Sequence, residues 1–131
     1  MKSIPMLILC LVLMVGLTSS QDCDDNDYVN GCSTPIKSWV DEFTWACNRH
    51  DVCYFCGQKL GVTRKQCDVD FYWRMKGSCP KWSWRNPSNR ASCLSTASSF
   101  YYGVRAGGGM PGFWNNDSPD WCFEPWVKKC L

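Results

Sequence analysis

Cysteine content constrains this chain more than any other feature. Eleven cysteines occur in 131 residues, and Cys10 lies in an apolar N-terminal run that follows Lys2 and ends in small residues before Gln21. This pattern is typical of a secretory signal peptide, so we expect residues 1–20 to be removed. The ten remaining cysteines predict five disulfides in an oxidising, extracellular environment, with their pairing left open. We therefore expect a secreted, single-domain protein over residues 21–131.

The overall charge excludes one large class of partners. The chain has 14 Lys and Arg against 12 Asp and Glu, which is too balanced for a nucleic-acid binder that depends on a strongly basic surface. Aromatic residues make up 15% of the chain and charged residues only 20%, a composition that disfavours disorder. A small folded protein with no nucleic-acid partner is predicted, and the composition leaves self-association open.

Three helices are expected after a polar loop over residues 22–38. The first runs from about Thr44 to Phe55, and Gly57 is a plausible stop signal. The second opens at Thr63, three residues before Gln66 in the spacing of a capping box, and stops near residues 77–80. A third is expected over residues 92–105. The short connection between the first two predicts an antiparallel pair, and the fold class is mainly α and disulfide-rich.

The segment with most chemistry contains the only histidine, His50, among Cys47, Cys53 and Cys56. Spacings of three residues suggest a zinc site, but nine residues turn a helix by a net half revolution, so the outer cysteines face opposite ways. The oxidising environment also favours disulfides over thiolates. A bland alternative is that His50 is an ordinary half-buried residue and Asp51 a solvated charge.

A third interpretation makes His50 a general base. If a disulfide joins Cys53 to Cys67, the antiparallel helices place Asp68 against the face that carries His50. A carboxylate that holds one imidazole nitrogen leaves the other free to take a proton from water. Asp51 points about 100° away from His50, toward the preceding loop, where backbone oxygens and one carboxylate suit a hard divalent cation.

These motifs resemble a known family. The segment from Cys47 to Tyr54 fits the C-x-x-H-D-x-C-Y pattern of secreted phospholipases A2, and Cys67 to Phe71 fits their later C-D-x-x-F pattern. The extension to Gly57 and the Asn30-Gly-Cys-Ser-Thr-Pro loop look most like the conodipine type from cone-snail venom. The resemblance is specific from Asn30 to Cys79.

The resemblance implies a role for each matched residue. His50 corresponds to the base that activates water, and Asp68 to the acid that orients the imidazole, with Asp70 as the runner-up for that position. Asp51 corresponds to the bidentate calcium ligand. The remaining ligands of Ca²⁺ would come from the loop before the first helix, mainly as backbone carbonyls, and we expect them at Asn30, Gly31 and Ser33. The Cys53–Cys67 bridge would crosslink the helix pair.

The implied activity is calcium-dependent hydrolysis of the sn-2 ester of glycerophospholipids by a secreted venom enzyme, and the implied partner is a phospholipid membrane surface. The rival interpretation is a catalytically weak toxin of phospholipase shape that acts on a receptor or ion channel. A cut into two disulfide-linked chains is expected between about residues 87 and 112. Tryptophan favours the membrane boundary, so a docking rim is expected among several of these residues: Trp39, Trp82, Trp84, Trp114, Trp121 and Trp126.

Overall fold

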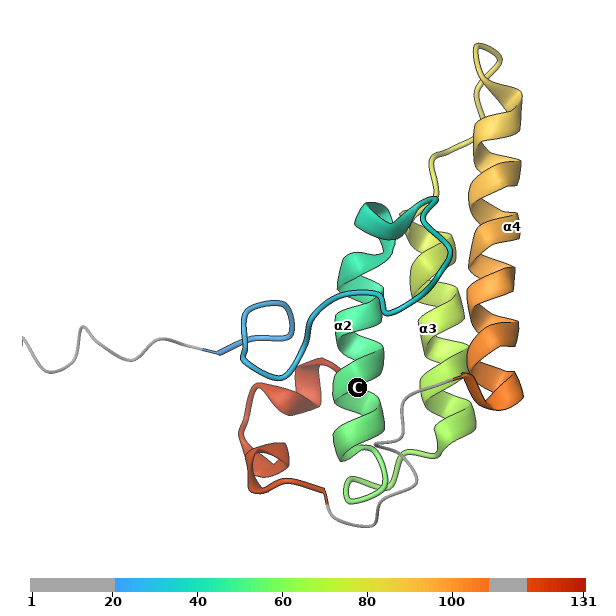
Figure 1. Ribbon diagram of the computed structural model, residues 1–131. Coiled ribbons are helices and arrows are strands. Elements are labelled where there is room, and N and C mark those ends of the chain that lie inside the picture. The colour runs from blue at the N-terminus through green and yellow to red at the C-terminus, as the bar shows by residue number, and fades with distance from the viewer. Residues whose placement is uncertain (1–20, 109–117) are drawn as a thin grey trace, which may run out of the picture.

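Three long helices form the body of the protein (Figure 1). The structure is a computed structural model, and it describes residues 21–108 and 118–131. Helices α2 (Val40–Cys56) and α3 (Arg64–Ser78) run antiparallel, and α4 (Pro87–Gly103) packs on the other side of α3 (Figure 1). A π-helical turn continues α4 over Val104–Gly108. Two short 3₁₀ helices, Asp120–Phe123 and Val127–Lys129, lie beside the lower half of α2 (Figure 1).

Helix α2 begins a turn earlier than the predicted start at Thr44. Asp41 and Glu42 lie in its first turn, where negative charge interacts well with the helix dipole, and Phe43 is fully buried. The predicted stop at Gly57 is confirmed, but close packing is its cause. A Cβ on Gly57 would lie 2.5 Å from the Cys53 carbonyl oxygen, so a larger residue would force the chain apart.

Helix α3 begins where the sequence predicts. The Thr63 hydroxyl accepts the Gln66 N–H at 3.1 Å, and the Gln66 side chain accepts the Thr63 N–H at 2.8 Å, which completes the capping box. Helix α4 corrects the predicted span of 92–105, because it begins at Pro87 and its regular part ends at Gly103. Proline suits the first helical turn, where its missing N–H costs nothing.

Five disulfides pair all ten cysteines of the described residues. They join Cys23 to Cys130, Cys32 to Cys47, Cys53 to Cys67, Cys56 to Cys122 and Cys79 to Cys93. The Cys53–Cys67 bridge crosslinks α2 to α3, so the predicted fold class is confirmed: mainly helical, without a strand in residues 21–108 and 118–131, and rich in disulfides. The zinc interpretation is wrong, because every cysteine near the histidine is in a disulfide.

The two larger apolar clusters of the described residues flank α2. The larger one fills the space between the three helices, and its members include Phe43, Ala46, Phe71, Met75, Ala97 and Phe100. The smaller one packs the C-terminal segment on α2 through Val52, Cys56, Cys122, Trp126 and Val127. The two disulfides that reach the C-terminal segment, at Cys122 and Cys130, hold it on the helical body.

Several predictions fall on the rest of the chain. The predicted signal peptide, residues 1–20, lies outside the described residues. The region expected to be cut, 87–112, contains α4 and extends into residues 109–112, which are also outside them. No helix within the described ranges is both long enough and apolar enough to cross a membrane.

Candidate active site

His50 meets Asp68 across the α2–α3 pair. The His50 Nε2 atom lies 2.7 Å from Asp68 Oδ1, and both side chains are buried. The Cys53–Cys67 disulfide explains the meeting, because His50 lies nearly one turn before Cys53 and Asp68 directly follows Cys67. Phe71, one turn further along α3, stacks on the imidazole with ring centroids 4.4 Å apart. The histidine is therefore fixed by a carboxylate on its edge and an aromatic ring on its face.

Asp68 is fully buried and surrounded by donors. The Tyr54 hydroxyl donates to the same oxygen as His50, and Arg105 Nη1 donates to the other oxygen at 2.8 Å. Arg64 lies one helical turn before Asp68, with Nε 3.8 Å from Oδ2. Burial alone would raise the pKa of Asp68, but the hydrogen bonds from His50, Tyr54 and Arg105 outweigh it and hold the pKa below its ordinary value. Asp68 is thus kept ionised.

Tyr54 takes part as a neutral donor. Burial, and then the hydrogen bond to Asp68, raises the pKa of Tyr54 to about 12. The hydroxyl therefore keeps its proton at physiological pH and donates it to the carboxylate. Its position in the C-Y pattern was visible in the sequence, but its contact with Asp68 was not predicted.

A cavity of about 270 Å³ opens beside His50. The residues that line it include His50 and Asp51 of α2, and Gly31 and Ser33 of the preceding loop. The other walls are mostly apolar and include Pro35, Ile36, Phe71, Phe100 and Val104. His50 Nδ1 has no hydrogen-bond partner within the described part of the chain, so the cavity holds an imidazole with one nitrogen available.

Asp51 differs from Asp68 in its surroundings. Its carboxylate lines the cavity and has neither a hydrogen bond nor an ion pair with any residue in the described ranges. Burial raises the pKa of Asp51 to about 7, and no other group offsets that effect. A buried carboxylate without a partner is costly, and a bound cation is one way to satisfy it.

The donor set around Asp51 fits a hard cation of calcium type. Gly31 and Ser33 bring backbone and hydroxyl oxygens to the same cavity. Asn30 is exposed and is not among the lining residues. No group of three or more His, Cys, Asp or Glu side chains converges anywhere in residues 21–108 or 118–131. A cation here would therefore depend on Asp51 and on loop oxygens, the ligands that Ca²⁺ accepts.

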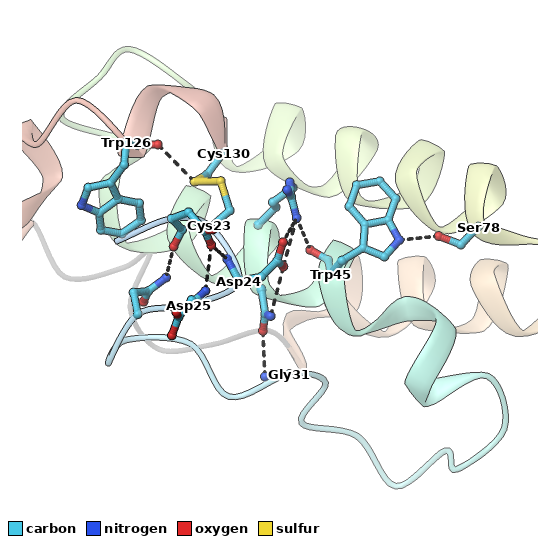
Figure 2. Close-up of polar contacts among 12 residues, drawn as sticks. Cys23, Asp24, Asp25, Gly31, Trp45, Ser78, Trp126 and Cys130 are labelled. Carbon is cyan, nitrogen blue, oxygen red and sulfur yellow. Dashed lines mark hydrogen bonds and ion pairs between the residues drawn. A yellow bond between two sulfur atoms is a disulfide. The ribbon is translucent and has the colours of Figure 1, made fainter. Parts of the chain in front are cut away.

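The loop is fastened to α2 by a residue that sequence analysis missed. The Gly31 N–H donates to Asn48 Oδ1 at 2.9 Å (Figure 2). The Asn48 amide in turn donates to Asp24 at 3.3 Å, and Arg49 donates to the same carboxylate at 3.0 Å. The Cys32–Cys47 disulfide holds the next residue of the loop. The loop therefore has two attachments, both on the turn of α2 that precedes His50.

Comparison with curated proteins finds conodipines of the genus Conus. The chain is 38% identical over 81 residues to Conodipine-P3 and 40% identical over 81 residues to Conodipine-P2, both from Conus purpurascens. Those matches cover 61% of this chain and 42% of each relative. It is also 38% identical over 52 residues to the Conodipine-M alpha chain of Conus magus, across 38% of this chain and 68% of that one. This chain belongs to the conodipine family.

The conodipine match has limits in length. The chain spans about two fifths of the length of the first curated relatives it matches, and about two thirds of the Conodipine-M alpha chain. No family model matches the sequence, and no solved structure matches it. Membership of the conodipine family agrees with the resemblance to conodipines noted in the sequence around His50-Asp51 and Cys67-Asp68. The active-site roles rest on the geometry of this chain.

The structure also separates the two carboxylates that competed for the role beside histidine. Asp70, the runner-up, is exposed and pairs with Arg74 one turn later on α3. Asp68 is the residue that contacts His50. Arg105 contacts Asp68 from beyond the end of α4, and no sequence signal pointed to it, because the two residues lie 37 positions apart.

Proposed function

We propose that this conodipine is a secreted, calcium-dependent phospholipase A2 of venom that hydrolyses the sn-2 ester of glycerophospholipids. One observation carries the proposal. A single cavity is lined by His50, whose imidazole is held by a buried carboxylate, and by Asp51, whose own carboxylate has no partner in the described part of the chain. Calcium-dependent hydrolysis of a phospholipid ester needs a general base and, close to it, a carboxylate that can bind the cation.

The chain's own residues can perform the proton transfer. His50 lines a cavity large enough for water, and its Nε2 is engaged with Asp68 while its Nδ1 has no hydrogen-bond partner among the described residues. As water attacks the ester carbonyl, His50 removes its proton and becomes positively charged. The ionised Asp68 stabilises that charge, while Tyr54 and Arg105 hold the carboxylate in place. The proton then passes to the leaving alkoxide, which gives a free fatty acid and a lysophospholipid.

Asp51, Gly31 and Ser33 are the residues that would hold calcium, which supplies positive charge for the substrate phosphate and the developing oxyanion. The apolar walls formed by Ile36, Phe71 and Phe100 offer a surface for an acyl chain. The cavity lining thus includes both residues with hard oxygen atoms and apolar side chains, as an amphipathic substrate requires.

Fatty-acid release from phosphatidylcholine vesicles tests the proposal directly. We expect release in calcium buffer, none with excess chelator, and full recovery when calcium is restored. Release that is equal with and without chelator would contradict the calcium assignment. The absence of release under every condition would favour the rival function, a toxin of phospholipase shape that binds a receptor or channel.

A further inference from the structure

Two exposed tryptophans lie far from the cavity. Trp82 is 50% exposed and Trp84 is 87% exposed, and their rings touch edge to face with centroids 4.3 Å apart. They belong to the segment between α3 and α4, residues 80–86, which we call the tryptophan loop. Within the set expected to form a docking rim, Trp126 is buried, Trp39 and Trp121 are partly buried, and Trp114 lies outside the described residues. The loop therefore holds the most exposed indoles of that set.

The tryptophan loop has a fixed base. The Cys79–Cys93 disulfide ties its start to α4, and Arg90 Nη1 donates to the Pro80 carbonyl at 2.9 Å. Within the loop the Arg85 N–H donates to the Ser83 hydroxyl at 3.2 Å. Exposed indoles on an anchored base can insert into a partner with little further loss of conformational entropy.

Charge on this part of the chain has one sign. Residues 71–105 contain no Asp or Glu. They contain six basic residues, namely Arg74, Lys76, Lys81, Arg85, Arg90 and Arg105. Lys81 and Arg85 flank the two tryptophans, are exposed, and form no ion pair with any described residue. The loop thus combines apolar rings with uncompensated positive charge, which complements an anionic surface.

The loop and the cavity occupy different ends of α4. The cavity uses Ser99, Phe100 and Gly103, near the C-terminal end of that helix, whereas the loop precedes Pro87. At about 1.5 Å per residue, the helix axis separates Pro87 from Ser99 by roughly 18 Å. Figure 1 shows the segment between α3 and α4 rising beyond the upper ends of α2 and α3. The loop is a protrusion of its own and not the rim of the cavity.

We propose that the tryptophan loop docks the protein on the anionic phospholipid surface of a membrane. Trp82 and Trp84 enter the boundary between headgroups and acyl chains, where indole is most stable, and Lys81 and Arg85 meet lipid phosphates. A protruding, cationic pair of indoles suits a broad anionic interface. The inference goes beyond the proposed catalysis, because docking requires neither His50 nor calcium.

Vesicle co-sedimentation of the full chain tests the docking surface, and His50→Gln is used so that hydrolysis cannot alter the vesicles. The probes are vesicles of phosphatidylcholine alone and of phosphatidylcholine with phosphatidylglycerol. We expect Trp82→Ala with Trp84→Ala to weaken binding to the anionic vesicles about ten-fold or more. Lys81→Glu with Arg85→Glu should weaken binding to anionic vesicles by a similar factor, and binding to neutral vesicles much less.

The chain offers a matched control elsewhere on its surface. Phe123 is 64% exposed, with the Lys59 ammonium 5.4 Å from its ring, so Phe123→Ala with Lys59→Glu removes one exposed ring and reverses one charge away from the loop. Binding of this control should stay near that of the parent protein. The proposal is overturned if both loop variants bind like the parent, or if the control loses binding equally. A loop variant that binds vesicles normally but no longer binds a protein target would assign the loop to a protein partner instead.

An activity assay distinguishes a loop variant that fails to fold from a failure of the proposed catalytic function. The loop variants built on a wild-type His50 should hydrolyse a short-chain, monomeric phospholipid at the parent rate, because the loop is remote from the cavity. If the parent hydrolyses nothing yet sediments with anionic vesicles through the loop, docking stands and the proposed catalysis falls.

Discussion

Asp51 and Asp68 are both buried carboxylates near His50, and they differ in what surrounds them. Asp68 is 0% exposed and has three hydrogen-bond donors, while Asp51 is 6% exposed and has none within the described residues. Their pKa values move in opposite directions for that reason, down for Asp68 and up to about 7 for Asp51. The chain satisfies the carboxylate of Asp68 with hydrogen bonds from its own side chains. The carboxylate of Asp51 has no partner among the described residues, and for this reason we propose it as the ligand of an external cation.

Replacement of the base or the cation ligand should have the largest effect on activity. We expect His50→Gln and Asp51→Asn each to lower hydrolysis of vesicles by about a thousand-fold, since one removes the proton acceptor and the other the anionic ligand. Fatty-acid release measures the loss, and circular dichroism checks the fold. Asp70→Asn is the matched control, because Asp70 is exposed and remote from the cavity. Near wild-type rates for either site variant would refute the assignment.

Asp68→Asn should give the largest loss of stability. The change removes the negative charge that faces His50 and the guanidinium of Arg105, and it replaces one of the two acceptor oxygens with an NH2 donor. We expect the free energy of unfolding to fall by about 3 kcal/mol. Urea denaturation with disulfides intact measures it. Asp70→Asn, in an exposed ion pair, should cost less than about 0.5 kcal/mol. Equal costs for the two variants would show that the donors around Asp68 contribute little.

Asp51 should behave in the opposite way. Its pKa is raised from 3.8 to about 7 in the folded state, so the folded protein keeps a proton that the unfolded chain has already released. Stability should therefore fall as pH rises from about 4 to about 7 in the presence of chelator, by about 4 kcal/mol from this residue. Denaturation at pH 5 and pH 8 measures the slope.

The same experiment has an internal control. Asp51→Asn should remove that slope and stabilise the protein at pH 8 in chelator, although it abolishes activity. Calcium added to the wild type at pH 8 should raise Tm and leave the variant unchanged, because a ligand that binds only the folded state stabilises it. If calcium does not change the Tm of the wild type, the proposal that Asp51 binds a cation is contradicted.

Arg105 should have the smallest of these effects. It is about one third exposed and contacts Asp68 but not the cavity, so it acts as a positioning residue. We expect Arg105→Ala to lower kcat about ten-fold with little change in KM, and Arg105→Lys to recover much of the loss, since a cation again faces the carboxylate. A change confined to KM would instead place Arg105 in substrate binding.

Local patterns allowed much of this molecule to be predicted. The capping box at Thr63 and Gln66 placed the start of α3 because both partners lie within one turn. The C-D-x-x-F pattern of the family resemblance favoured Asp68 over Asp70, and Asp68 is the residue that contacts His50. The first turns of α2 and α4 were missed. Tertiary burial of residues such as Phe43, and the proline at the start of α4, decide those helix ends, and intrinsic propensity does not.

The sequence by itself determined the helical, disulfide-rich class of this protein and predicted that His50 and Asp68 would lie together. Only the tertiary structure decided what surrounds them. Arg105 reaches Asp68 across 37 positions, Asn48 holds Gly31 across 17, and α4 supplies an apolar wall of the cavity. Such contacts leave no local periodicity in a sequence. They exist because three packed helices and five disulfides bring distant side chains together, and that packing gives Asp68 its hydrogen-bond donors and leaves Asp51 without one among the described residues.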